Sequence, residues 1–110
     1  MVSDQRLIFL STDTDYFYMN NMDKIKQTLQ QIFHIHHLEL IDESFKHASH
    51  AQAKRAGGGH FQLLIVSSDF AGKTLVQRHR MVNDALKEQF RSVIHALSIK
   101  ALTPEEESRL

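Results

Sequence analysis

The 110-residue chain contains no cysteine. It therefore cannot form a disulfide bond, a catalytic thiolate, or a zinc or iron–sulfur site built from its own sulfur atoms. It also has no excess of charge of either sign, because thirteen basic residues balance thirteen acidic ones. A net charge of zero excludes a strongly basic nucleic-acid-binding protein and a polybasic membrane-binding protein, unless the charges are segregated on the surface.

Long apolar runs are lacking as well. The longest one near the N-terminus, Leu7–Leu10, is too short for the hydrophobic region of a signal peptide or for a membrane span. We therefore predict a soluble, cytoplasmic protein that binds no membrane. Residues 1–19 show no clean periodicity, and Met19 and Met22 are both candidate start sites, so we expect an N-terminal extension followed by one domain at residues 20–110.

The composition is otherwise that of a globular domain, with 42% apolar and 24% charged residues. Eight histidines are the unusual feature. Because imidazole is the strong metal ligand that this chain does possess, metal or cluster binding is the first function to consider. No motif indicates an enzyme, since there is no nucleophile–histidine arrangement, no phosphate-binding glycine loop and no convincing carboxylate pair.

Hydrophobic periodicity divides residues 20–110 into helices and strands. Apolar residues recur at helical spacing from Met22 to Phe33 and from Leu75 to Phe90, whereas a continuous apolar run at 60–67 indicates a central strand. The predicted elements are a helix from Asn20 or Asn21 to about His34, strands at 37–44 and 60–67, a helix at 74–91 kinked near its start, a strand at 95–102, and a short helix capped by Thr103.

This order of elements predicts an α+β fold. The first two strands can pair as a hairpin across a long connection at 45–59, and the helix at 74–91 then crosses over to make the last strand parallel to its neighbour. The result is a three-stranded mixed sheet with the helices packed on one face. The buried stripe of the crossing helix is expected to hold Leu75, His79, Val82, Leu86 and Phe90.

Six short motifs stand in this framework: His60-Phe61, Ile65-Val66-Ser67, Phe70-Ala71-Gly72-Lys73, the segment from Gln77 to Val82, Ile94-His95-Ala96-Leu97 and Leu102-Thr103-Pro104. Together they resemble the BolA family, in particular bacterial members with a histidine-bearing loop. The resemblance covers residues 22–106 and implies a class II KH-like fold of order αββαβ, which agrees with the order above. It also implies a role with monothiol glutaredoxins in iron–sulfur cluster trafficking, or, for bacterial members, in stress-linked transcription regulation.

Two histidines become candidate cluster ligands through this resemblance. His95 stands in the His-Ala motif whose histidine is a ligand in the family, and the connection at 45–59 supplies the second ligand. His47 is the favoured residue there, because it comes soonest after the strand, and His50 competes with it. The residues alone favour a simpler interpretation, in which His95 is a strand-end side chain hydrogen-bonded to the backbone and His47 and His50 are solvated loop residues.

The ligand inventory points to a partner. A [2Fe–2S] cluster needs four ligands, and two imidazoles with two thiolates are an established set. This chain offers imidazoles only, so the two sulfurs would come from a partner, and the resemblance implies that this partner is a monothiol glutaredoxin with its bound glutathione. We expect that the isolated chain, a monomer or weak homodimer, binds no cluster. We expect the partner to dock around His95, the 45–59 connection and residues 73–80.

DNA binding is the competing hypothesis. A cluster of basic residues along the second long helix and its approach could hold phosphates despite the zero net charge. Against this, KH domains hold the backbone with a Gly-x-x-Gly loop, and the corresponding segment here, Gly72 to Leu75, has a single glycine. The candidate phosphate-binding residues are Lys73, Arg78, Arg80, Lys87 and Arg91.

Overall fold

The computed structural model describes residues 20–44 and 59–110. The predicted extension at 1–19 and most of the long connection, including His47 and His50, lie outside the described residues. The elements in chain order are α3 (Asn21–Ile32), β1 (Ile35–Asp42), β2 (Gly59–Ser67), the 3-10 turn η2 (Ser68–Phe70), α5 (Leu75–Ala85), α6 (Lys87–Phe90), β3 (Ile94–Leu102) and α7 (Pro104–Ser108).

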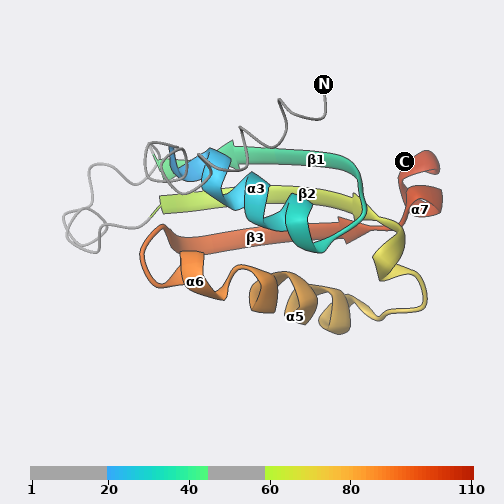
Figure 1. The fold of residues 1–110 in the computed structure, drawn as a ribbon. Helices are drawn as coiled ribbons and strands as arrows, with labels where there is room; N and C mark the ends of the chain where they lie inside the picture. Colours follow the sequence, from blue (N-terminus) through green and yellow to red (C-terminus); the bar gives the residue numbers. More distant parts are fainter. Residues whose placement is uncertain (1–19, 45–58) are drawn as a thin grey trace, which may run out of the picture.

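The three strands form one mixed sheet in the order β1-β2-β3, as predicted. β1 pairs antiparallel with β2, and β2 pairs parallel with β3. The parallel pair follows from α5 and α6, which carry the chain back along the sheet before β3 begins (Figure 1). The predicted α+β fold is therefore confirmed, and the strand boundaries differ from the expected ones by at most two residues.

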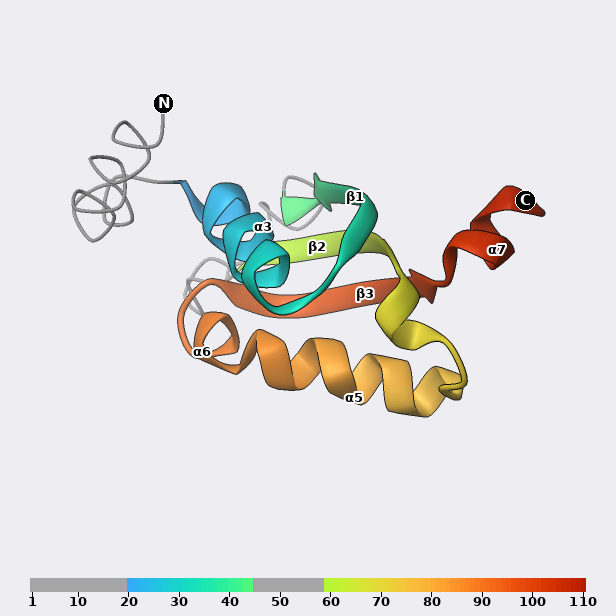
Figure 2. The same ribbon diagram turned by 45° about the vertical axis from the view of Figure 1, so that its right-hand side comes forward.

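One face of the sheet and the helices α3 and α5 enclose the core (Figure 2). Alternate strand residues point to this face, so that Leu40 on β1, Leu63 on β2 and Ile99 on β3 lie side by side in register. Ile25 and Leu29 of α3 pack against them without any exposed surface. No helix within these described ranges is long and apolar enough to cross a membrane.

The second long helix differs from its prediction. It is interrupted at Leu86 rather than kinked near its start, and α6 continues beyond the break. Its buried face holds Arg78, Val82, Leu86 and Gln89, whereas Leu75 is 66% exposed. The predicted hydrophobic stripe is wrong at both ends because two polar side chains, Arg78 and Gln89, are buried with hydrogen-bond partners. Gln89 Nε2 donates to Thr28 Oγ1 of α3 at 2.9 Å.

Helix α7 lies beyond the end of β3 and contacts β2 and β3 (Figure 1). The predicted capping by Thr103 is confirmed, because its hydroxyl accepts from Glu106 N at 3.2 Å while the Glu106 carboxylate accepts from Thr103 N at 2.9 Å. The ring of His37, on β1, contacts Glu107 of α7 through Nδ1 and Glu39 through Nε2. These carboxylates, Glu107 first, raise the pKa of His37 above its ordinary value.

We predict that His37 makes the attachment of α7 pH-dependent. A group with a raised pKa stabilises the folded state fully below its ordinary value of 6.5, and this contribution is lost as the pH rises through the raised value. The substitution His37→Gln should therefore lower the urea midpoint below pH 6.5 and lower it less as the solution becomes alkaline. The exposed neighbour His36→Gln is the control, and a pH-independent difference for His37→Gln would contradict the prediction.

Candidate functional site

His95 occupies a β-bulge at the start of β3. Gly59 pairs with Ile94 and His60 pairs with Ala96, so His95 is one extra residue on the β3 side of the ladder. A bulge leaves the extra residue unpaired and re-aims its side chain, and bulges are frequent next to functional sites. The side chain of His95 is accordingly exposed, which fits a ligand offered to a partner better than a strand-end side chain packed in the sheet.

The imidazole of His60 lies beside that of His95. The ring centroids are 5.0 Å apart and the rings are tilted by 44°. Two imidazoles bound to one tetrahedral metal ion, with metal–nitrogen distances of about 2.1 Å, would have centroids roughly 5 Å apart. The spacing of this imidazole pair is therefore compatible with binding to a common metal centre.

His60 is the residue that sequence reasoning undervalued. His60 belongs to the His60-Phe61 motif, but no local pattern in the sequence pairs it with His95. The available signal was the crossover: if β2 and β3 are parallel, their first residues meet at the same end of the sheet. His60 and His95 are near those first residues.

Polar contacts close the base of the long connection next to this imidazole pair. His60 N donates to Ser44 Oγ at 3.1 Å, and Glu43 N donates to His60 O at 2.7 Å. Asp42 Oδ1 accepts from Ser44 N at 2.9 Å. At Gly59 a Cβ atom would lie 2.8 Å from Ser44 Oγ, so glycine allows the two ends of the connection to approach. His47 follows Ser44 by three residues along the chain.

The described residues do not complete a metal site by themselves. Within residues 20–44 and 59–110, no group of three or more histidine, aspartate or glutamate side chains is placed to hold a metal ion. A groove of about 640 Å³ exists in the helix layer, lined in part by Ile32, Asp69 and Met81, and it includes neither member of the imidazole pair. Further ligands for a metal centre at the pair would have to come from elsewhere.

Two parts of the predicted docking surface, His95 and residues 73–80, lie toward different ends of the sheet. Arg78, within the segment 73–80, donates to Ala101 O near the end of β3, whereas His95 is the second residue of that strand. The two strand positions are six residues apart, which corresponds to roughly 20 Å. Residues 73–80 therefore lie toward the opposite end of the sheet from the imidazole pair (Figure 1), and the docking surface stays a prediction.

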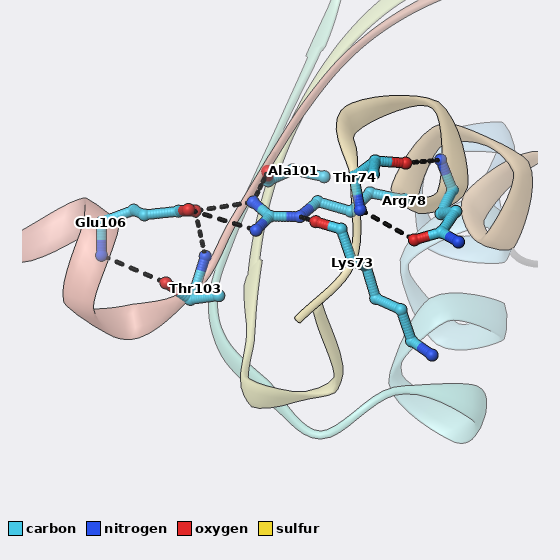
Figure 3. A network of polar contacts seen from close by, with 7 residues as sticks. Lys73, Thr74, Arg78, Ala101, Thr103 and Glu106 are labelled. Carbon is cyan, nitrogen blue, oxygen red and sulfur yellow. Dashed lines mark hydrogen bonds and ion pairs between the residues drawn. The ribbon is translucent and has the colours of Figure 1, made fainter. Parts of the chain in front are cut away.

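Arg78 does not belong to a phosphate-binding surface. Its side chain is 8% exposed, and Nη1 and Nη2 donate to the two carboxylate oxygens of Glu106 at 2.6 and 3.1 Å (Figure 3). Nη1 also donates to Ala101 O and Nε donates to Lys73 O, each at 3.0 Å. The guanidinium holds the pKa of Glu106 at about 2. This arginine is thus an internal tie between α5, β3 and α7.

The other basic candidates remain on the surface. Lys73, Arg80, Lys87 and Arg91 are exposed, and Arg91 makes a 3.4 Å ion pair with Glu88 of α6. The four residues are spread from the approach to α5 to the end of α6 rather than gathered at one point, since the last follows the first by eighteen positions. Such a row of cations suits contacts with successive phosphates better than a compact anion pocket.

Comparison with known proteins identifies the family. Residues 29–106 match the family model described as BolA-like protein. The chain belongs to the BolA family. The structure is similar to that of BolA1 from Arabidopsis thaliana, with a TM-score of 0.68 and 35% sequence identity over 80% of this chain and 96% of that one.

Two relatives show the range of BolA-like proteins. One is SufE-like protein 1, chloroplastic/mitochondrial, of Arabidopsis thaliana, which is 42% identical over 76% of this chain. The chain spans about a quarter of the length of that protein (24%). The other is the DNA-binding transcriptional regulator BolA of Haemophilus influenzae, which is 39% identical over 74% of this chain and 76% of the relative. The first relative is thus named as a SufE-like protein and the second as a transcriptional regulator.

We predict that substitution of two arginines two positions apart will change the stability of the protein by very different amounts. Arg78→Ala removes the donors to Ala101 O, Lys73 O and Glu106, and should lower the free energy of unfolding by about 2–3 kcal/mol, because it leaves partly buried acceptors without a partner. Arg80→Ala, on the exposed face, should change it by less than about 0.5 kcal/mol. Urea unfolding measures both, and equal effects would contradict the assignment.

Proposed function

We propose that this BolA-like protein is a non-enzymatic adaptor that binds a monothiol glutaredoxin and shares a [2Fe–2S] cluster with it. The observation that carries the proposal is the imidazole pair, in which a bulge exposes His95 beside His60. His95 is the first ligand. The second is His60, His47 or His50; His60 is favoured by its spacing from His95 and His47 by its short chain connection to Ser44.

The chemistry of the donor set supports a partner. The chain has no cysteine, so its ligands to iron are imidazoles, and two thiolates must come from the glutaredoxin and its glutathione. Two neutral imidazoles in place of two thiolates make the cluster less negative and raise its reduction potential. The protein side of such a complex binds and orients the cluster, and the exposed position of His95 leaves the opposite side open to the thiolates.

The test is anaerobic co-purification with a monothiol glutaredoxin and glutathione, followed by visible circular dichroism. The wild-type complex should give a cluster spectrum that differs from that of the glutaredoxin homodimer, and His95→Ala should abolish it. Of His60→Ala, His47→Ala and His50→Ala, the variant that removes the second ligand should shift the spectrum. His36→Ala, an exposed histidine on β1, is the control. An unchanged spectrum in His95→Ala would refute the shared cluster.

DNA binding is the second candidate, and two observations favour it. The relatives in Haemophilus influenzae and Escherichia coli are both named DNA-binding transcriptional regulator BolA. Four of the five basic residues considered in the sequence are exposed, on α5 and α6 or directly beside these helices. The loss of Arg78 from the set weakens the argument without removing it, because Lys73, Arg80, Lys87 and Arg91 retain their charges at the surface.

If these cations bind phosphates, affinity for duplex DNA should fall steeply with salt. Each phosphate contact contributes about 0.9 to the slope of log K against log salt concentration, so Lys87→Gln with Arg91→Gln should reduce the slope by roughly 1.8. Fluorescence anisotropy with a labelled duplex measures this. Exchanging Lys24 and Lys26 of α3 for glutamine is the matched control. An unchanged slope in the α6 variant would assign no DNA contact to these residues.

A further inference from the structure

The face of the sheet opposite the core carries side chains from all three strands. Because strand residues alternate, this face holds the residues between the core positions. The register arranges them in rows across the sheet. The rows, from the α7 end to the imidazole pair, are His37–Val66–Leu102, Glu39–Leu64–Lys100, Ile41–Gln62–Ser98 and His60–Ala96.

The two ends of this face differ. The row that contains Val66 is closed, since Val66 has no exposed surface and His37 contacts Glu107 of α7. The next two rows are open. Ile41 is 50% exposed, and a shallow depression of about 290 Å³ runs over these rows. The residues that line the depression are Glu39, Ile41, Gln62, Leu63, Leu64, Ser98 and Lys100.

This open face is continuous with the imidazole pair. His60 shares the face with Gln62 and Leu64, two and four residues further along β2. The row that contains Gln62 is therefore roughly 7 Å from the row that contains His60. A protein that reaches a metal centre held by His60 and His95 thus meets the depression as the next surface along the strands, whereas α3 and α5 cover the other face.

We propose that the monothiol glutaredoxin docks on this open face, with its thiolates at the imidazole pair and its body over the rows of Ile41 and Leu64. This inference rests on the proposed function and assigns the docking surface that the function requires. Cluster ligands alone bury little area. A specific complex of standard size buries about 800 Å² on each partner, and a weak or transient complex buries less. The open rows supply part of that area next to the ligands.

The chemistry of the face defines what the partner must present. Leu64 lies between Glu39 on one side and Lys100 on the other in the same row. A complementary surface has an apolar side chain over Ile41 and Leu64, a cation near Glu39 and an anion near Lys100. The exposed cations Lys73 and Arg80 are outside this interface, because they lie next to or on α5, which covers the opposite face of the sheet.

The test is the dissociation constant of the complex between the full chain and a monothiol glutaredoxin with glutathione, measured under anaerobic conditions. Ser98→Arg places a long cation on the exposed centre of the open face and should raise the dissociation constant at least tenfold. Gln62→Arg, in the same row, is a second variant with the same expectation. Asn83→Arg, exposed on α5, is the matched control and should stay within twofold of the wild type.

The outcomes separate the docking face from the shared cluster. If both face variants bind as tightly as the wild type, or if Asn83→Arg weakens binding equally, the docking face is wrong even where the cluster spectrum forms. If the complex carries no cluster signal but both face variants still weaken it, the docking face stands and the cluster proposal fails. Sedimentation of the isolated chain tests whether a second copy of this chain occupies the face instead. A homodimer that Ser98→Arg dissociates would assign the face to that second copy. No binding by the wild type overturns both.

Discussion

Parallel pairing between β2 and β3 is the constraint on which the candidate site depends. It requires a crossover, which α5 and α6 provide, and it places the beginnings of both strands at one end of the sheet. His60 and His95 are near those beginnings, so residues 35 positions apart in sequence meet through backbone hydrogen bonding rather than through any local motif. The bulge then exposes His95 without interrupting the pairing that continues to Leu102.

The two ends of the sheet differ in the residues that they carry. At the end that holds the imidazole pair, small and polar residues such as Gly59 and Ser44 allow the end of β1 and the start of β2 to lie close together. At the other end, charged side chains are used internally, since Arg78 and His37 both bind carboxylates of α7. A net charge of zero thus conceals a charge distribution in which some ions stabilise the fold and others remain at the surface.

Much of the fold could be predicted because it follows from periodicity and capping. The run at 60–67 and the Thr103–Glu106 capping box depend on neighbours within a few residues, and both were placed correctly. The buried face of α5 could not be predicted in the same way. Arg78 is a charged residue, which is expected on the exposed face of a helix. Its burial depends on Glu106, which is 28 residues away and comes within reach only in the folded chain.

The candidate site was predictable in part, and for a related reason. His95 was singled out through its resemblance to the BolA motif, which the family match supports as a resemblance. The proximity of His60 to His95 depends on the register between β2 and β3, which includes a bulge that no sequence pattern predicts. Proposals for His47 and His50 remain predictions, because those residues lie outside the described part of the chain.

The contacts of Arg78 have a consequence for where this domain can be cut. A fragment that stopped at Leu102 would keep all three strands of the β1-β2-β3 sheet, yet it would retain a guanidinium 8% exposed while discarding the carboxylate that neutralises it. A fragment of this domain should therefore extend through Glu106 at least, although α7 adds no residue to the core. Leu110, 78% exposed beyond that helix, is by contrast a position where a fused tag would disturb none of these contacts.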